Sequence, residues 1–260
     1  LLFHPMKPHF ITPDQIGTRY DDIYVTAEDS TRLHGWKLYS EPDPIGAILY
    51  FHGNAENVST HFTNVYWLTK HGYDVYLFDY RGYGQSEGEA DLDLIIKDSE
   101  RMIEAIVSRE DVENIIVIGQ SLGASIAIHV VAHSKYRQHI SALIAISAFS
   151  DYHDVTQDAL SRSWLFWAFQ WPLSYTINND YSPVKSVGSV SPIPLVIAHS
   201  SNDGMIDDYH AERLLNEANA PKQFLKLEGE HNTIFRYDAN KTKLLEFLDT
   251  LNAISTKNRH

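Results

Sequence analysis

The sequence predicts an α/β fold with a mostly parallel sheet flanked by helices. Three observations lead to this prediction. Short apolar runs alternate with longer amphipathic stretches, which is the pattern of strands followed by helices. This alternation builds βαβ units, whose strands run parallel, and it continues along most of the chain without an internal repeat. The length of 260 residues, 43% of them hydrophobic, suits one large core, so we expect residues 1–260 to form a single domain.

The predicted elements follow from local patterns. Strands are predicted at residues 23–26, 33–39, 47–51, 75–78, 115–118, 143–146, 195–198 and 224–227. The first two flank a turn at residues 28–30, which indicates a hairpin. Helices are predicted near residues 58–70, 92–108 and 122–133, and after each of the last two strands. In residues 92–108 the apolar positions recur with the period of 3.6 that marks an amphipathic helix.

Residues 151–191 interrupt this rhythm. They contain no strand pattern but a dense cluster of aromatic residues and several prolines. We predict a small helical cap, inserted in the domain and lying over one end of the sheet. Trp164, Trp167 and Trp171 are spaced three and four apart, which places them on one helix face. This aromatic face either packs the cap onto the core or lines an apolar substrate pocket, and the two roles are compatible.

Composition excludes several classes of function. Lys and Arg total 21 and Asp and Glu total 34, so the formal net charge is 21 − 34 = −13. Nucleic acids and anionic membrane surfaces bind clustered cations, so neither is an expected partner. Cysteine is absent, which excludes disulfides, thiolate catalysis and thiolate-bound metals.

The start of the chain bears on its location. No apolar run approaches the roughly 18 residues that span a bilayer. The chain begins with Leu1 rather than Met, from which we expect that an upstream segment was removed; a signal or a membrane anchor is one candidate for it. The cellular compartment stays open.

Residues 119–123, with the sequence GQSLG, match the G-x-S-x-G nucleophile elbow. This motif is a sharp turn between a strand and a helix that exposes the serine at the end of the sheet. Ser121 follows a predicted strand directly and precedes a predicted helix, so it is the candidate nucleophile. Residues 84–88, GQSEG, match the same pattern, but Ser86 lies in a glycine-rich turn well past its strand. We predict a structural role for Ser86.

A serine nucleophile needs a base and an acid that orients the base. The order on this type of fold is serine, acid, histidine. His231 lies in the loop after the last predicted strand and is the candidate base. Asp203 lies in the loop after the preceding strand and is the candidate acid. Three aspartates remain as rivals for the acid: Asp207 and Asp208, which are expected to begin a helix, and Asp151.

The oxyanion of a tetrahedral intermediate needs two preorganised donors. The candidates are the backbone N–H of Leu122, directly after the nucleophile, and that of Asn54, in the loop after strand 47–51. His52, in the same loop, is expected to be structural. His129 and His133 share a helix face, but no Glu follows His129, so the zinc-protease pattern is missing. We predict surface or packing roles for these two histidines rather than a metal site.

Four features occur together in order: residues 52–57 (HGNAEN), residues 79–84 (DYRGYG), the elbow at 119–123, and Asp203 followed by His231. In these the chain resembles the α/β-hydrolase superfamily over residues 20–252. The particular likeness is to the serine-aminopeptidase-like branch, related to the abhydrolase-domain acyl and lipid hydrolases. The resemblance implies an eight-stranded sheet with its second strand antiparallel, a cap after the sixth strand, and no cofactor. One departure is Ser200, where the family usually has glycine.

Together these features predict a serine hydrolase that cleaves a carboxylic ester or thioester through an acyl-enzyme on Ser121. The expected partner is a small acyl substrate. A second hypothesis is a small serine peptidase or amidase, in which Glu56 or Glu230 would bind the substrate amine. A third is a binding protein that keeps the fold without the chemistry, although all three residues of the triad are present.

Overall fold

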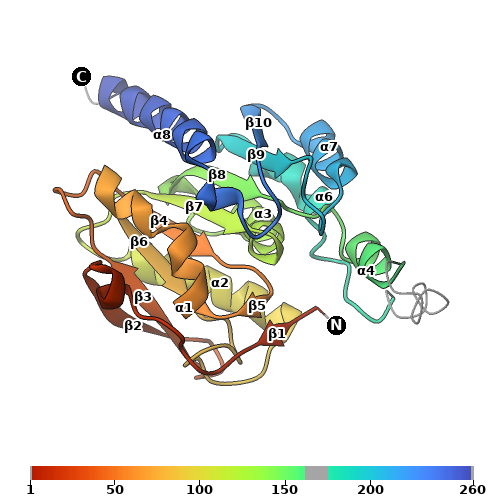
Figure 1. The fold of residues 1–260 in the computed structure, drawn as a ribbon, viewed down its shortest axis with the longest axis horizontal. Coiled ribbons are helices and arrows are strands. Elements are labelled where there is room, and N and C mark those ends of the chain that lie inside the picture. Colours follow the sequence, from red (N-terminus) through yellow and green to blue (C-terminus); the bar gives the residue numbers. More distant parts are fainter. Residues whose placement is uncertain (1, 162–174, 259–260) are drawn as a thin grey trace.

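The structure, a computed structural model, describes residues 2–161 and 175–258 (Figure 1). Its centre is an eight-stranded sheet. The strands are β2 (Tyr20–Thr26), β3 (Arg32–Leu38), β4 (Gly46–Phe51), β6 (Tyr73–Phe78), β7 (Ile115–Gln120), β8 (Ile140–Ile146), β9 (Leu195–Ser200) and β10 (Lys222–Leu227). A second sheet of two short strands joins β1 (His4–Pro5) to β5 (Ala55–Glu56).

The order of strands in the main sheet is β10-β9-β8-β7-β4-β6-β3-β2. β3 is antiparallel to both of its neighbours, and every other pairing in this sheet is parallel. The fold class and the antiparallel second strand are therefore confirmed. Each predicted strand coincides with a strand of this sheet, with shifts at the ends. The carboxyl ends of the parallel strands meet along one edge, and the loops that follow them lie there together.

Helices cover both faces of the sheet. Along β4 the side chains alternate: Leu49 and Phe51 point into one hydrophobic core, and Ile48 and Tyr50 into the other. The first core contains side chains of α2 (Leu92–Val107), α3 (Leu122–His133) and α7 (Asp208–Glu217), and the second contains side chains of α1 (Val58–His61) and α8 (Asp238–Asn258). Figure 1 shows α1 and α8 in front of the sheet and α2 behind it.

The helix predicted near residues 58–70 is largely wrong. Only α1 is α-helical, and two tighter 3-10 segments follow at Phe62–Asn64 and Tyr66–His71. The stretch is rich in β-branched residues, which are poor helix formers. The hydroxyl of Thr63 also donates to the carbonyl of Thr60 at 2.6 Å, and that of Thr69 to the carbonyl of Tyr66 at 2.7 Å. Such bonds compete with the regular helical ladder.

The segment predicted as a cap is described in part. It contains α4 (Tyr152–Ser161), which lies at the edge of the molecule, α6 (Pro183–Ser186) and a 3-10 turn at Val187–Val190 (Figure 1). Val187 and Val190 are buried in the same core as α3. Trp164, Trp167 and Trp171 lie outside the described residues, so the cap and its aromatic face stay predictions.

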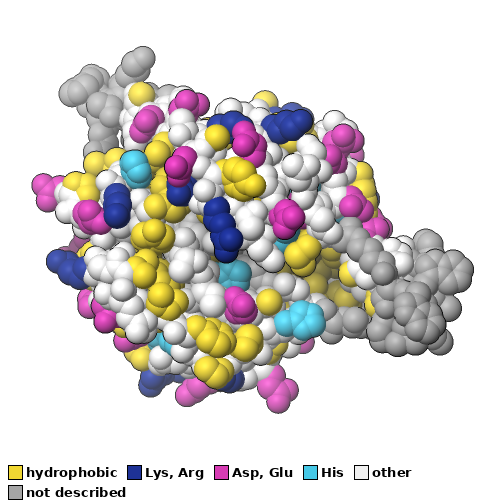
Figure 2. Space-filling view, in the orientation of Figure 1, with side chains coloured by type: hydrophobic (Ala, Val, Ile, Leu, Met, Phe, Trp, Pro, Cys, Tyr) yellow, Lys and Arg dark blue, Asp and Glu magenta, His cyan; other side chains and the backbone are white. Residues whose placement is uncertain are grey.

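The surface agrees with the composition. Over the described part of the face in Figure 2, Lys and Arg side chains are scattered singly among acidic ones rather than gathered in one basic patch. None of the described helices has the length and apolar character that a membrane span requires.

Candidate active site

Ser121 occupies a strained turn between β7 and α3. Its backbone has φ 55° and ψ −123°, which is a left-handed region that residues other than glycine rarely adopt. The residue is 9% exposed. Leu122, the first residue of α3, has an N–H without an intrahelical partner, because the first turn of a helix has none to offer. The structure thus has the elbow geometry that residues 119–123 predict.

Two glycines permit this turn. A Cβ atom on Gly119 would collide with the backbone of Gly123 and Ala124. A Cβ atom on Gly123 would collide with the carbonyl groups of Phe51 and His52, at the end of β4. Helix α3 can therefore pack directly against the strands only because both positions lack a side chain.

Asp203 and His231 are brought together from two neighbouring loops. The Nδ1 atom of His231 lies 2.8 Å from Oδ2 of Asp203. The other carboxylate oxygen of Asp203 accepts hydrogen bonds from the N–H groups of Met205 and Ile206 at 2.9 and 3.0 Å. Burial alone would raise the pKa of the Asp203 carboxyl, but the bond from His231 and these two N–H groups lower it to about 2. The ionised carboxylate only accepts, so Nδ1 of His231 carries the proton of this bond, and Nε2 is the nitrogen with a free lone pair when the imidazole holds one proton.

The rival aspartates are used elsewhere. Asp207 is the residue before the first turn of α7, and Asp208 begins that helix, with its carboxylate 3.4 Å from His199. Asp151 accepts hydrogen bonds from the N–H groups of His153 and Asp154 at the start of α4. Of the predicted acids, Asp203 is the one that bonds to His231.

Gln120 is a site residue that the sequence analysis missed. Its side-chain oxygen accepts from the Tyr50 hydroxyl at 2.7 Å and from the Asn64 amide at 2.9 Å, and its side-chain nitrogen donates to the carbonyl of His231 at 3.3 Å. It therefore ties the elbow to the loop that carries the base. Its place inside the GQSLG motif was the only available signal, because its three partners are far away in the sequence.

The loop that carries Asn54 is held by the first residues of the chain. The carbonyl of Asn54 accepts hydrogen bonds from the Tyr83 hydroxyl at 2.7 Å and from the N–H of His4 at 2.9 Å. The pairing of β1 with β5 continues this contact to Glu56. His52, in the same loop, bonds to the Gly53 carbonyl through Nδ1, and burial lowers its pKa to about 3, so its ring is neutral. This agrees with the structural role expected for it.

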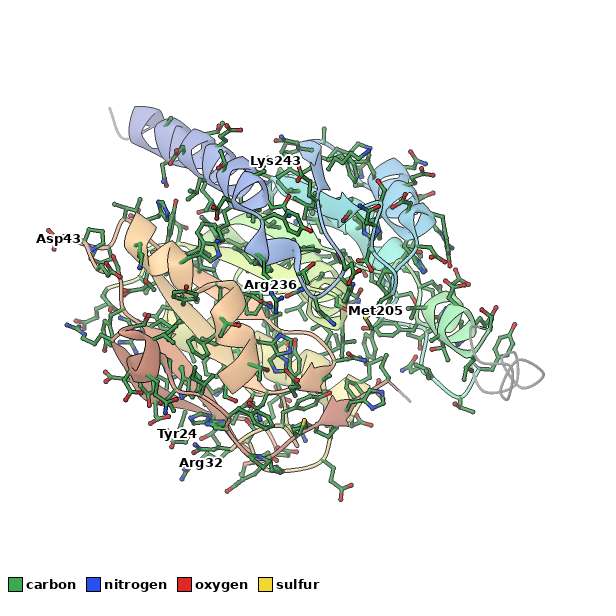
Figure 3. The ribbon with its side chains drawn as sticks, in the orientation of Figure 1. Tyr24, Arg32, Asp43, Met205, Arg236 and Lys243 are labelled. Carbon is green, nitrogen blue, oxygen red and sulfur yellow. The ribbon has the colours of Figure 1, made fainter. Side chains whose placement is uncertain are left out.

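One cavity of about 810 Å³ is lined by residues of the elbow, of the loop that carries Asn54 and of the loop that carries His231. Asn54, Gln120, Ser121 and His231 all line it. Met205 and Arg236, both labelled in Figure 3, come from the loops after β9 and β10 and also line it. The apolar side chains of its lining are those of Ile16, Ala55, Tyr66, Trp67, Met205 and Phe235. Its size lies within the range of about 300–1,000 Å³ that is usual for small-molecule sites.

Two sequence features lie outside this cavity. The Ser86 hydroxyl donates to the Asp79 carbonyl at 2.6 Å and accepts from the His34 N–H at 2.9 Å, and only 1% of the residue is exposed. His129 stacks on His133 with ring centroids 4.4 Å apart, and His129 bonds to Ser186. The first observation agrees with the structural role predicted for Ser86, and the second agrees with a packing role for His129 and His133.

The family model for the serine aminopeptidases of group S33 matches residues 42–188. The chain belongs to this family of α/β hydrolases. The matched residues of this S33 family member include the elbow at 119–123. Membership makes the protein a hydrolase and supports a small-molecule substrate rather than a nucleic acid.

Known proteins similar to this S33 hydrolase include YfhR of Escherichia coli K12. It is 31% identical over 248 residues, which cover 92% of this chain and 83% of YfhR. The α/β hydrolase domain-containing protein WAV2 of Arabidopsis thaliana is 30% identical over 222 residues, covering 82% of this chain and 71% of WAV2. Among solved structures, the Pyrococcus furiosus esterase Pf2001 superposes with a TM-score of 0.79 at 21% identity, over 96% of this chain and 98% of the esterase. This last likeness shows the fold.

In this S33 hydrolase, Ser200 replaces the usual glycine of the loop that carries Asp203, and its side chain forms two hydrogen bonds. The Ser200 hydroxyl donates to the Gly229 carbonyl at 2.6 Å and accepts from the Asn202 N–H at 3.2 Å. Ser200 is fully buried. Its side chain thus links the loop that carries Asp203 to the loop that carries His231, and the departure leaves the Asp203–His231 bond in place.

Proposed function

We propose that this hydrolase cleaves a carboxylic ester or thioester through an acyl-enzyme on Ser121. The observation that carries the proposal is the bond between His231 and Asp203, with His231 lining the same cavity as the strained serine. This arrangement supplies a nucleophile, a base with its free nitrogen on Nε2, and an ionised acid that orients the base. The apolar part of the cavity lining suits an acyl chain.

The chemistry follows from these positions. His231 takes the proton of the Ser121 hydroxyl as the oxygen attacks the acyl carbon. The resulting oxyanion is stabilised by the backbone N–H groups of Leu122 and Asn54. His231 then protonates the leaving alcohol or thiol, and the acyl chain stays on Ser121. A water molecule, deprotonated by His231, attacks this acyl-enzyme, and proton return to Ser121 releases the acid.

A second candidate, a small serine peptidase or amidase, rests on Glu56. Glu56 lines the cavity, and its backbone has φ 64°, a strained value for a residue other than glycine. An acid at this place would bind the amine of an aminoacyl substrate. Glu230, the other predicted amine ligand, does not line this cavity. A panel of matched acyl esters, thioesters and aminoacyl amides separates the two candidates by relative kcat/KM.

Labelling with a fluorophosphonate probe, measured by intact mass, tests the serine mechanism. We expect one adduct on the wild-type protein and on Ser86→Ala, and none on Ser121→Ala. The second G-x-S-x-G serine is a matched control because it occurs in the same pattern without lining the cavity. No adduct on the wild type would favour the non-catalytic binding protein.

Asp203→Asn should lower kcat for an ester by roughly 10⁴-fold. An asparagine amide donates to Nδ1 of His231, which moves the imidazole proton to Nε2 and leaves no base facing Ser121. Asp207→Asn, in the same loop, is the control and should keep activity close to that of the wild type. Steady-state kinetics on both variants measure the effect. Equal activities of the two variants would contradict the assignment of Asp203.

A further inference from the structure

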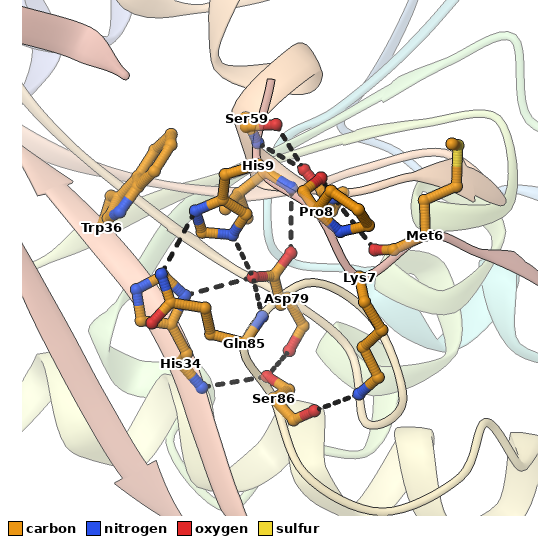
Figure 4. Close-up of polar contacts among 12 residues, drawn as sticks. Met6, Lys7, Pro8, His9, His34, Trp36, Ser59, Asp79, Gln85 and Ser86 are labelled. Atoms are coloured by element: carbon orange, nitrogen blue, oxygen red, sulfur yellow. Dashed lines mark hydrogen bonds and ion pairs between the residues drawn. The ribbon is translucent and has the colours of Figure 1, made fainter. Parts of the chain in front are cut away.

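Three side chains from distant parts of the chain converge on one point away from the active-site cavity. His9 comes from the N-terminal segment, His34 from β3, and Asp79 from the position directly after β6 (Figure 4). One ligand atom of each lies within 4.8 Å of those of the other two. The side chains of His34 and Asp79 are fully buried, and that of His9 is 12% exposed. None of the three lines the active-site cavity.

The distances in this cluster are long for hydrogen bonds to a carboxylate. Oδ2 of Asp79 lies 3.1 Å from Nδ1 of His34 and 3.3 Å from Nε2 of His9. Charge-assisted N–H···O bonds are usually about 2.7–2.9 Å long. Two ligand atoms held at about 2.0–2.1 Å by one tetrahedral zinc ion lie about 3.3 Å apart. The His9 separation therefore equals the edge of a zinc coordination shell, and the His34 separation lies between that edge and a strong hydrogen bond.

The outer partners also suit a metal. The second nitrogen of His34, Nε2, lies 2.7 Å from Oδ1 of Asp22, which also accepts from the Trp36 indole at 3.0 Å. A proton held on Nε2 by this carboxylate leaves the Nδ1 lone pair for a metal ion, which is the usual support for a histidine ligand. Nδ1 of His9 lies 3.3 Å from the side-chain amide of Gln85, which presents an oxygen acceptor when rotated by half a turn.

The contacts of Asp79 also suit a metal ligand. Its Oδ1 accepts a hydrogen bond from the N–H of Val58 at 2.9 Å, which fixes the carboxylate plane and aims Oδ2 at the two imidazoles. The N–H of Gln85 lies 3.2 Å from Oδ2 as well, so one oxygen faces three nitrogen atoms. An oxygen with two lone pairs serves three separate donors poorly. A single cation between this oxygen and the two imidazoles would relieve that crowding.

We propose that His9, His34 and Asp79 form a structural binding site for a divalent transition-metal ion, zinc being the best match. Two imidazole nitrogens and one carboxylate oxygen favour zinc over Mg²⁺ or Ca²⁺, which prefer oxygen ligands. The fourth ligand would be water on the exposed side of His9. The ion would fasten the N-terminal segment to β3 and to the end of β6. Through β1, this segment also contacts the loop of Asn54.

Zinc titration of the full chain, previously dialysed against a chelator, tests the proposal by calorimetry and native mass spectrometry. We expect one zinc ion per chain and a Tm that rises with zinc, because an ion that binds the folded state stabilises it. His9→Ala should abolish both effects, and Asp22→Asn should weaken binding by about 10- to 100-fold. Magnesium chloride at the same concentrations should change neither readout.

His4→Ala is the matched control, because His4 lies on the same segment but outside the cluster. It should bind zinc as the wild type does. The removed imidazole of His9 is on the partly exposed edge, and circular dichroism checks that this variant folds. Absence of stoichiometric zinc in the wild type, or unchanged zinc binding by His9→Ala, would overturn the proposal and leave a hydrogen-bonded network. Neither result depends on the proposed esterase activity.

Discussion

Ser121→Ala is expected to lower kcat/KM for an activated ester by on the order of 10⁴- to 10⁶-fold. Alanine removes the nucleophilic oxygen, and the remaining His231 and Asp203 have nothing to activate. Alanine tolerates the strained backbone at this position as well as serine does, so the variant should keep the wild-type fold. Steady-state hydrolysis of a short p-nitrophenyl ester, together with circular dichroism, measures both expectations.

Ser86→Ala is the control for this prediction. It removes two buried hydrogen bonds, to Asp79 and His34, so it should lower Tm while leaving kcat within a few-fold of the wild type. The two substitutions should therefore change different quantities. Ser121→Ala should lower turnover, and Ser86→Ala should lower stability. A Ser121→Ala protein that keeps more than a tenth of the wild-type rate would rule out the acyl-enzyme on Ser121.

The largest effect on stability is expected for Gly123→Ala. The added Cβ would meet the carbonyl groups of Phe51 and His52, both in the backbone at the end of a central strand, which cannot swing away as a side chain does. Overpacking against a flexible neighbour costs about 1–3 kcal/mol, and a collision with backbone costs more. Folded domains have only about 5–15 kcal/mol of stability, so we expect a large drop in the free energy of unfolding and in the yield of soluble protein.

Gly204→Ala is the matched control for this substitution. A Cβ atom at Gly204 would meet nothing within 4 Å, so the free energy of unfolding should change by no more than about 0.5 kcal/mol. Urea denaturation and the yield of soluble protein measure both variants. Equal midpoints for Gly123→Ala and Gly204→Ala would show that α3 does not need its close approach to β4.

Much of the fold could be read from local patterns. Buried parallel strands are short apolar runs, and this signal placed all the strands of the main sheet. For residues 58–70 the same reasoning gave a wrong prediction. Their apolar spacing suggested a helix, but their threonine hydroxyls bond to nearby carbonyls. Periodicity reports which face is buried, and it does not report such competing bonds.

The candidate site could likewise be predicted only in part from the sequence. Ser121 could be predicted because the elbow is a local structure, whose glycines must stand two residues on either side of the serine. Asp203 and His231 were placed by the order of strands and loops, and three other aspartates competed with Asp203. Only the distance of 2.8 Å between the side chains of Asp203 and His231 distinguishes it from those rivals.

The sequence by itself determined the succession of strands along the chain, the elbow at Ser121 and the loops that carry Asp203 and His231. Each of these depends on neighbouring residues or on the succession of elements. The tertiary structure alone decided that Gln120 reaches His231 and that His4 supports Asn54. It also decided that His9 meets Asp79, although 70 residues separate them. These contacts arise because the chain packs distant segments against each other, and no spacing in the sequence records that packing.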